Sequence, residues 1–406
     1  MKMEIQRKFI LLVSALYPPE PVVSAHLSLD IYEEIKNGGH NIRVFHPKAS
    51  RPNGFHFKNE IIVGEDEYVS ESYVCPKSSL LGRFIESISF GKATYKFIIE
   101  HKNEISSIYA NTWPLFGQYY LAKAAKKTGI PYYMHVQDVY PESYCSKMPN
   151  IIGKLLHYAL LPIDKYVLRN ASGVIGISPS MISYLSESRC IEKTKFTLVR
   201  NWQDDQSFIE AYTPKEEVLK VCEVMYLGSV NPTANVALII NSFSNLDASK
   251  YHLSIIGNGP DKDKCQALAE KVGANVTFGV ATLEEVPTIQ GSADILVLSL
   301  RRGVAKTATP SKLTAYMLTG RPIIVSVDLD SDCANIIREA GCGEVVEPDN
   351  MEALTKAIER ISKLSIEEKN NFGKAAFDYA VAHLSKERNL SILTNLITKG
   401  NNDCSK

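Results

Sequence analysis

A lysine at the predicted start of a helix is the residue of this 406-residue chain that most directly suggests chemistry. Residues 310–322 read PSKLTAYMLTGRP, and proline is well tolerated at a first helical position, so the pattern predicts a helix with Lys312 in its first turn. The helix dipole disfavours a cation there unless an anion binds beside it. We therefore expect Lys312 to hold a phosphate or diphosphate. The alternative is a lysine whose stem covers apolar surface while its ammonium stays in water.

Two loops offer further contacts to an anion. The loop before the predicted helix, RRGVAKTAT at 301–309, adds Lys306 and short hydroxyl side chains. A second loop, GNGP at 257–260, lies between a strand pattern and a helix pattern. Its Gly-x-Gly lets the backbone come near a ligand, although such a pair often only makes a turn. Lys306 and Gly257 are therefore candidates for ligand contact.

A histidine and a carboxylate follow one predicted strand. The segment HVQDVYPES at 135–143 starts at the carboxyl end of the strand pattern PYYMHV. In parallel sheets ligands lie beyond that end of the strands. His135 and Asp138 could therefore hold sugar hydroxyls or transfer a proton. The alternative makes Asp138 a turn cap and His135 a core residue with satisfied hydrogen bonds.

The first predicted strand, at 9–16, leads into the loop YPPEPVVS at 17–24. This loop lacks the Gly-x-Gly-x-x-Gly of dinucleotide sites, which disfavours a dinucleotide oxidoreductase. Its prolines make it stiff, and it follows the carboxyl end of a strand. We interpret it as one wall of an acceptor site, a rigid turn being the alternative. The candidate residues are Tyr17, Pro19, Glu20 and Ser24.

A metal site is not expected. The aspartates of VDLDSD at 327–332 are oxygen ligands of the kind that Mg²⁺ prefers. They directly precede a helix pattern, however, where acidic residues are common caps, and we favour that interpretation. The eight cysteines form no C-x-x-C pair, so neither a zinc site nor a disulfide framework is predicted. A reducing cytoplasm is the expected compartment.

Strand patterns and helix patterns alternate along the chain, which is typical of parallel sheets covered by helices. One series starts at 9–16, and a second starts at 222–230 and ends in a helical stretch at 369–397. Each series is long enough for a doubly wound domain of its own. We predict an α/β protein with two Rossmann-like domains and a C-terminal helix with a tail, at 1–205, 206–380 and 381–406.

Charge is divided unevenly although the net charge is zero. Residues 1–200 hold 24 Lys+Arg against 18 Asp+Glu, and residues 201–406 hold 21 against 27, which gives +6 and −6. A basic half favours an anionic partner such as a membrane surface, chance variation being the alternative. Segments 80–97 and 151–170 of that half are apolar at near-helical spacing, which suits an anionic membrane surface or packing on a sheet. No apolar run approaches the ~18 residues that a membrane span needs, and we interpret the start of the chain as a strand rather than a signal peptide.

Taken together, the motifs resemble those of retaining glycosyltransferases of the GT4 family, which have the GT-B fold. The resemblance is strongest to bacterial members that add sugars to lipid-linked precursors of capsule, O-antigen or exopolysaccharide. It covers nearly the whole chain with the motifs in the family's order. The matching segments are YPPEP (17–21), HVQDVYPES (135–143), GVIGISPSM (173–181), LVRNWQD (198–204), TPSKLTAYMLTGRPII (309–324) and REAGCGEVVEPDN (338–350).

The resemblance implies two domains facing a central cleft, with the final helix crossing back to the N-terminal domain. It places a nucleotide-sugar donor in the C-terminal domain, with Ser311 and Lys312 on the donor phosphates. Asp138, with His135, would lie beside the reacting sugar. The other implied donor contacts are Gly228, Ser229, Gly257, Val280, Lys306, Leu313 and Tyr316. GT-B enzymes typically need no metal, so no cofactor is expected.

Two positions depart from the family pattern. The family's paired glutamates fall on Thr307 and Ala315, neither of which is acidic. A glutamate at 315 would ordinarily hold the nucleotide ribose, so Ala315 removes that contact. The loop GSVNPTAN at 228–235 also lacks the Arg and Lys of many members. Phosphate binding then depends more heavily on Lys312 and Lys306.

We expect a hexosyl-transferring enzyme that uses a UDP-sugar and a polyprenyl-diphosphate-linked saccharide. It would act in the cytoplasm, peripherally on the inner face of the cytoplasmic membrane, with no nucleic-acid partner. Two alternatives remain open. Thr307 and Ala315 would suit a non-catalytic GT-B partner of another transferase. A GT-B sugar-nucleotide epimerase would interconvert sugars with no acceptor present.

Overall fold

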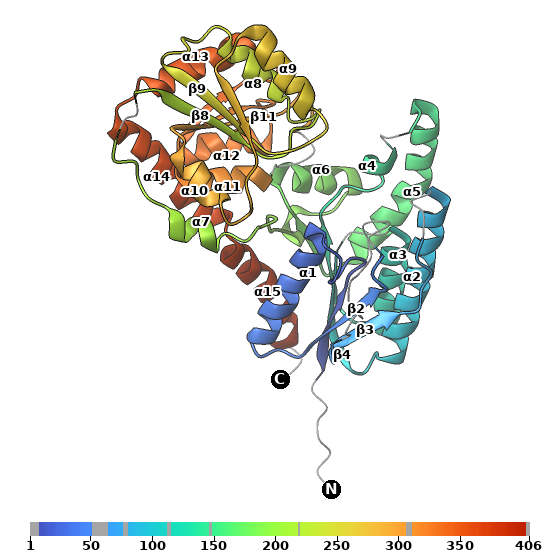
Figure 1. Ribbon diagram of the computed structural model, residues 1–406. Coiled ribbons are helices and arrows are strands. Elements are labelled where there is room, and N and C mark those ends of the chain that lie inside the picture. The colour runs from blue at the N-terminus through green and yellow to red at the C-terminus, as the bar shows by residue number, and fades with distance from the viewer. Residues whose placement is uncertain are drawn as a thin grey trace. The chain divides into compact units, whose positions relative to one another are not determined.

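The chain forms two compact units, each built on its own parallel sheet (Figure 1). Unit 1 comprises residues 1–200 and 390–406, and unit 2 comprises residues 201–389. The computed structural model describes residues 8–50, 64–75, 80–111, 115–145, 148–217, 220–305 and 311–402. The predicted α/β fold class with two domains is confirmed.

The sheet of unit 1 has seven strands in the order β3-β2-β1-β4-β5-β6-β7, and every pairing is parallel. All residues of β1 and of β5 are buried, as expected for central strands covered on both faces. The strands are β1 (Phe9–Val13), β2 (Ile42–Pro47), β3 (Glu67–Ser70), β4 (Ile105–Asn111), β5 (Tyr132–Val136), β6 (Gly173–Gly176) and β7 (Phe196–Leu198).

Helices cover both faces of this sheet. Figure 1 shows α2, α3 and α5 on one face and α1 and α15 on the other. The first face is packed with apolar side chains from the helices, among them Phe97, Leu121 and Val167. The helices of unit 1 are α1 (Val23–Asn37), α2 (Leu80–Glu100), α3 (Leu115–Thr128), α4 (Glu142–Cys145), α5 (Asn150–Asn170), α6 (Pro179–Arg189), the 3₁₀ turn Lys193–Lys195 and most of α15 (Lys386–Asn402).

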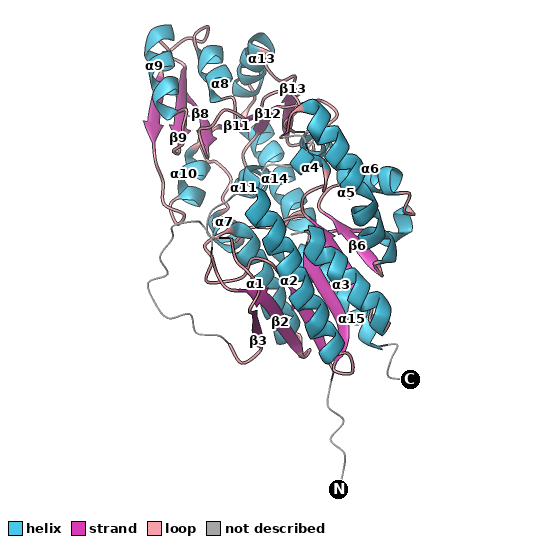
Figure 2. Cartoon of the chain, turned by 90° about the vertical axis from the view of Figure 1, so that its right-hand side faces the viewer, coloured by secondary structure: helices cyan, strands magenta, loops and turns pink. Residues whose placement is uncertain are grey.

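Unit 2 has a six-stranded parallel sheet in the order β10-β9-β8-β11-β12-β13, with a separate apolar core on each face. Figure 2 shows its strands between the covering helices. The strands are β8 (Cys222–Leu227), β9 (Tyr251–Ile256), β10 (Val276–Gly279), β11 (Ile295–Ser299), β12 (Ile323–Ser326) and β13 (Gly343–Val346). The helices are α7 (Gln206–Ala211), α8 (Val236–Phe243), α9 (Lys262–Val272), α10 (Val286–Ser292), α11 (Ser311–Thr319), α12 (Asp332–Ala340), α13 (Met351–Ser362) and α14 (Ile366–His383).

Strand order reverses at one place in each sheet. The reversal lies between β1 and β4 in unit 1, and between β8 and β11 in unit 2. In open parallel sheets, ligands bind beyond the carboxyl ends of the strands at such a point. The topology therefore directs attention to the loops that follow β1 and β4, and to those that follow β8 and β11.

The helical stretch at the end of the chain is two helices rather than one. α14 ends at His383 and α15 begins at Lys386. The break is stabilised by a buried carboxylate, because Asp205 accepts a hydrogen bond of 2.7 Å from the backbone N–H of Lys386. Asp205 lies 181 residues earlier in the chain, so local periodicity carries no signal for this cap.

Candidate active site

Lys312 lies in the first turn of α11, as the sequence predicts, and its side chain extends over the carboxyl end of β8. Its Nζ donates a hydrogen bond of 2.5 Å to the hydroxyl of Tyr226 and lies 4.6 Å from the centroid of that ring. A longer contact of 3.5 Å reaches the carbonyl oxygen of Ser229. The ammonium is thus held at the point where strand order reverses in unit 2.

No carboxylate among the described residues pairs with this ammonium. Burial without a counter-charge lowers the pKa of Lys312 from its usual 10.5 to about 8. The side chain is therefore mostly protonated at neutral pH, but its charge is poorly compensated. An anion placed beside it would supply the missing charge and would also meet the N–H groups of the first helical turn.

Glycines at the ends of β8 and β9 allow close approach, Gly228 to the lysine side chain and Gly257 to the backbone of Gly228. Gly228 has φ +148°, and a Cβ on it would lie 2.6 Å from Cε of Lys312. Gly257 also has φ +148°, and a Cβ there would lie 2.1 Å from the carbonyl oxygen of Gly228. The backbone N–H of Gly228 donates to Ile256 at 2.8 Å, so the two loops are tied together. Only glycine fits where these backbones approach so closely.

Two predicted donor-binding side chains lie beneath this surface. Leu313 and Tyr316 are 1% and 0% exposed. The Tyr316 hydroxyl accepts a hydrogen bond of 2.7 Å from the backbone N–H of Leu227 and donates one of 3.0 Å to its carbonyl oxygen. Tyr316 therefore fastens α11 to the end of β8. A direct donor contact by either side chain stays a prediction.

The other predicted donor residues lie around the same edge. Ser229 is exposed beside Lys312, and Val280 is 63% exposed just after β10. Ala315 is 7% exposed on α11 and offers no carboxylate to a ribose. Lys306, the side chain of Ser311 and Thr307 lie outside the part of the chain that the structure describes.

The loop after β11 is held in place by contacts that sequence reasoning missed. Both carboxylate oxygens of Asp328 accept hydrogen bonds from the backbone N–H of Gly303, at 3.0 and 2.8 Å. Arg301 donates to the carbonyl oxygen of Pro232 at 2.6 Å and so ties this loop to the loop after β8. Asp328 belongs to the acidic run considered as a metal site, and its carboxylate holds the loop that follows β11.

In unit 1, Asp138 and His135 differ sharply in exposure. Asp138 is exposed two residues beyond the end of β5. His135 is 0% exposed, and its Nδ1 lies 2.8 Å from the hydroxyl of Tyr109. Burial lowers the pKa of His135 to about 3, so the ring is neutral at pH 7. Asp138 can meet a ligand directly, whereas a catalytic role for the enclosed His135 stays a prediction.

The loop after β1 contains a buried carboxyl. Glu20 is 3% exposed, and its Oε1 accepts a hydrogen bond of 2.7 Å from the backbone N–H of Ser50. Burial raises the pKa of Glu20 to about 7. Tyr17 is also buried and packs against the ring of His46, whereas Pro19 is exposed and Ser24 is partly exposed. The predicted acceptor residues thus divide into two that support the loop from inside and two at its surface.

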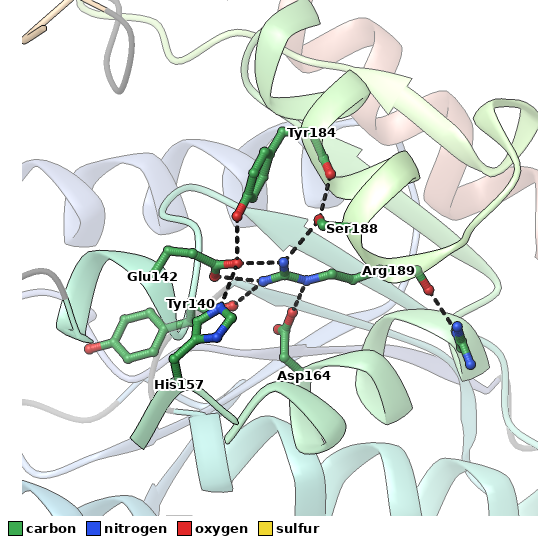
Figure 3. Close-up of polar contacts among 8 residues, drawn as sticks. Tyr140, Glu142, His157, Asp164, Tyr184, Ser188 and Arg189 are labelled. Atoms are coloured by element: carbon green, nitrogen blue, oxygen red, sulfur yellow. Dashed lines mark hydrogen bonds and ion pairs between the residues drawn. The ribbon is translucent and has the colours of Figure 1, made fainter. Parts of the chain in front are cut away.

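A buried arginine near Asp138 was also missed. Arg189, at the end of α6, is 0% exposed and binds Glu142, Asp164 and the carbonyl oxygen of Tyr140 (Figure 3). Its sequence context, SESRC, resembles an ordinary polar helix end, so no local pattern marks it. Within each unit, the described residues of the predicted site lie toward the carboxyl edge of that unit's sheet.

Several solved structures share the fold of this chain. Sucrose-phosphate synthase from Thermosynechococcus elongatus matches with a TM-score of 0.69 at 14% identity, covering 98% of this chain and 100% of that one. The lipopolysaccharide outer core galactosyltransferase WaaB matches with a TM-score of 0.67 at 15% identity, covering 96% and 99%. HepE from Anabaena, solved with UDP-glucose, matches with a TM-score of 0.60 at 13% identity, covering 97% and 99%. The two units therefore define the GT-B class.

Family models cover most of the chain. The model for glycosyltransferase family 4 matches residues 26–207, and that for glycosyl transferases group 1 matches residues 211–379. The chain is a glycosyltransferase and belongs to the GT4 family, as predicted. It is 21% identical to WcaI of Escherichia coli K12, a glycosyl transferase assigned to colanic acid biosynthesis, over 93% of this chain and 97% of that protein. It is 20% identical to "Probable glycosyltransferase WbjE" of Pseudomonas aeruginosa, over 59% of this chain and 61% of that protein.

Proposed function

We propose that this glycosyltransferase moves a hexosyl group from a UDP-sugar to a polyprenyl-diphosphate-linked saccharide, with retention of anomeric configuration. The single observation that carries the donor assignment is Lys312, a largely buried ammonium without a described carboxylate partner at a helix start. A diphosphate supplies the charge that this site lacks. The complex of the structural neighbour HepE with UDP-glucose supports a UDP-sugar as the donor class.

Lys312 would act by stabilising the leaving group. As the bond from the sugar anomeric carbon to phosphate breaks, negative charge grows on the phosphate oxygen, and a fixed cation with helix N–H groups stabilises that charge. The acceptor hydroxyl attacks the anomeric carbon from the same face, and its proton passes to the departing phosphate oxygen. The step needs no protein nucleophile. Asp138 would orient the reacting sugar, as the family resemblance implies.

An apolar and basic surface in unit 1 supports a lipid-linked acceptor. Large apolar side chains are exposed on the first half of α5, with Ile151 at 77%, Leu155 at 69% and Tyr158 at 83%. The start of α2 also exposes a large apolar side chain, Leu81, at 72%. Since soluble surfaces rarely expose such side chains together, this group favours contact with another phase or molecule.

Charge favours a membrane as that phase. The same helices carry exposed basic residues, including Lys154 on α5 and Lys92 on α2. Lysines among apolar side chains on one helix suit an interface with anionic lipids. Among the described helices, none is long and apolar enough to cross a bilayer. The protein would then bind the cytoplasmic face of the membrane peripherally, where its lipid-linked acceptor lies.

The pathway is proposed from the relatives. WcaI is assigned to colanic acid biosynthesis and WaaB to the lipopolysaccharide outer core. Colanic acid and the lipopolysaccharide outer core are both bacterial surface polysaccharides built from activated sugars. We infer that this protein adds a sugar to a precursor of a bacterial surface polysaccharide such as capsule or O-antigen.

The donor assignment is tested by calorimetric titration of UDP into wild type and Lys312→Gln, with Lys271→Gln as the matched control. Lys271 is an exposed lysine on α9 of the same unit. We expect Lys312→Gln to weaken UDP binding at least tenfold and to lower turnover roughly 100-fold, the usual scale for one lost charge-stabilising donor. The control should match wild type.

Transfer is tested with UDP-sugars and a polyprenyl-diphosphate-linked monosaccharide in vesicles. Transfer of the sugar to lipid supports the proposal. Failure of wild type to bind UDP at millimolar concentration would instead favour the non-catalytic partner that Ala315 suggests. Interconversion of the UDP-sugar without acceptor would indicate an epimerase.

A further inference from the structure

The buried guanidinium of Arg189 joins three elements of unit 1. It lies at the end of α6, and Nε donates a hydrogen bond of 2.7 Å to Asp164 of α5. Nη1 and Nη2 donate to the two carboxylate oxygens of Glu142 of α4, at 2.6 and 2.7 Å. Nη2 also donates to the carbonyl oxygen of Tyr140 at 2.6 Å. One side chain thus holds α4, α5 and the loop between β5 and α4.

The contacts on the loop side are close to Asp138. Tyr140 is two residues beyond Asp138, and Glu142 is four residues beyond it. Figure 3 shows the forked guanidinium facing the Glu142 carboxylate, with the hydroxyl of Tyr184 on the same carboxylate. A bidentate pair fixes direction as well as distance. The segment that carries Asp138 is therefore anchored at a backbone atom and at a side chain.

The contacts on the helix side fasten the same loop to α5. Asp164 is 4% exposed and faces the guanidinium. His157 of α5 lies 3.3 Å from Glu142. Near the start of α5, a Cβ on Gly153 would lie 2.5 Å from the carbonyl oxygen of Cys145, so α4 and α5 pack backbone against backbone. α5 is also the helix whose first half exposes large apolar side chains.

Stability alone is a weak explanation for such a group. Burying an arginine with two carboxylates carries a desolvation cost that apolar residues of similar volume would avoid, and such replacements are often neutral or stabilising. Buried ionic groups do, however, impose one geometry on the segments that they join. Here the segments are the loop with the exposed Asp138 and the helix of the proposed membrane surface.

We propose that Arg189 is a positioning residue for the transfer step, fixing the loop of residues 138–145 on α5 so that Asp138 meets the reacting sugar in one orientation. The inference rests on the proposed transferase activity, and it assigns no substrate contact to Arg189 itself. Because misplacement of a reacting group by about 1 Å can cost roughly 100-fold in rate, loosening this anchor should affect transfer strongly. In the proposed function UDP is bound by unit 2, so UDP binding should not change.

The test compares Arg189→Lys and Glu142→Gln with Arg321→Lys. Lysine keeps the charge of Arg189 but cannot form the fork, and Glu142→Gln keeps the side-chain shape with Asp164 still neutralising the arginine. Arg321 is a matched control, because it is 5% exposed in unit 2 and its guanidinium donates to backbone carbonyls such as that of Gly291.

Below the melting temperature of every variant, we expect kcat/KM for the vesicle-embedded acceptor to fall at least tenfold in Arg189→Lys and Glu142→Gln. The affinity for UDP and the binding to vesicles should stay within twofold of wild type, and Arg321→Lys should match wild type in transfer. Wild-type transfer by both variants, or parallel losses of UDP affinity and transfer, would overturn the inference. If wild type itself transfers no sugar, the proposed function fails instead.

Discussion

Replacing Lys312 by methionine should stabilise the free protein while abolishing its response to UDP. Methionine is unbranched and flexible, so it can follow the path of the lysine stem past Gly228. It removes an ammonium that is largely buried without a described carboxylate partner. The hydroxyl of Tyr226 keeps a partner in the variant, because it donates a hydrogen bond of 2.7 Å to the carbonyl oxygen of Ser229.

The magnitude follows from the pKa of Lys312. Lowering that pKa from 10.5 to about 8 corresponds to about 3 kcal/mol of disfavour for the charged form. Partial exposure of the side chain reduces the stability gained by removing the charge. The variant also loses the hydrogen bond to Tyr226, which reduces that gain by a further ~1 kcal/mol. We therefore expect the free energy of unfolding at pH 7 to rise by roughly 1 kcal/mol in the variant.

The pH dependence gives an independent check on the cause. The folded-state pKa is lower than the unfolded-state pKa, so the unfolded chain binds more protons between pH 8 and 10.5. Stability of wild type should therefore rise relative to the variant across that range, so the variant's advantage should be full below pH 8 and should decline progressively between pH 8 and 10.5. UDP affinity of wild type should fall as pH rises past about 8, because the ammonium that binds the diphosphate is lost.

The assay is urea-induced unfolding at pH 7 and pH 9.5, with thermal shift in the presence and absence of UDP. Lys271→Met, at an exposed position of α9, is the control and should change the free energy of unfolding by less than about 0.5 kcal/mol. A Lys312→Met variant that is less stable than wild type at pH 7, yet still melts higher with UDP, would refute the reasoning. Lys312 would then be a structural residue and not a diphosphate ligand.

Two further substitutions test the geometry of each unit. Gly228→Ala should weaken UDP binding at least tenfold, because its Cβ would lie 2.6 Å from Cε of Lys312. Gly273→Ala is the control: Gly273 also has positive φ but open space around the Cβ, so the substitution should lower stability without changing UDP affinity. Equal UDP affinity in the two variants would contradict the role of Gly228. Ile151→Ser should weaken sedimentation with anionic vesicles about tenfold, since an exposed side chain of this size contributes roughly 1.5 kcal/mol when buried. Leu283 of unit 2 is 87% exposed, and the control variant Leu283→Ser should bind vesicles like wild type. If Leu283→Ser loses vesicle binding and Ile151→Ser does not, the membrane surface has been assigned to the wrong unit.

Periodicity alone was sufficient to predict the architecture. Runs such as FILLV and ILVLS are buried at every position, and this is the pattern that central parallel strands require. Three short elements, β3, β7 and α4, were missed. The hydrogen bond that caps the last helix was missed because Asp205 comes from a distant segment.

The candidate site was only partly accessible to sequence reasoning. The place of Lys312 in a first helical turn follows from proline and dipole rules that act locally. Its electrostatic state does not, because the low pKa depends on which groups of other strands surround the ammonium. Tyr316 and Leu313, predicted to touch the donor, proved to lie in the core, since a helical period cannot say how deep a given face is buried.

The sequence by itself determined the alternation of strands and helices, the family motifs and the residue types at the carboxyl ends of the strands. These are properties of neighbouring residues, and short-range sterics and hydrophobic spacing fix them. Tertiary structure alone decided that Gly228 clears a path for Lys312, and that Arg189 gathers two carboxylates and a carbonyl around one buried charge. Those arrangements depend on distances between residues up to 84 positions apart, and they exist only after the sheets have assembled.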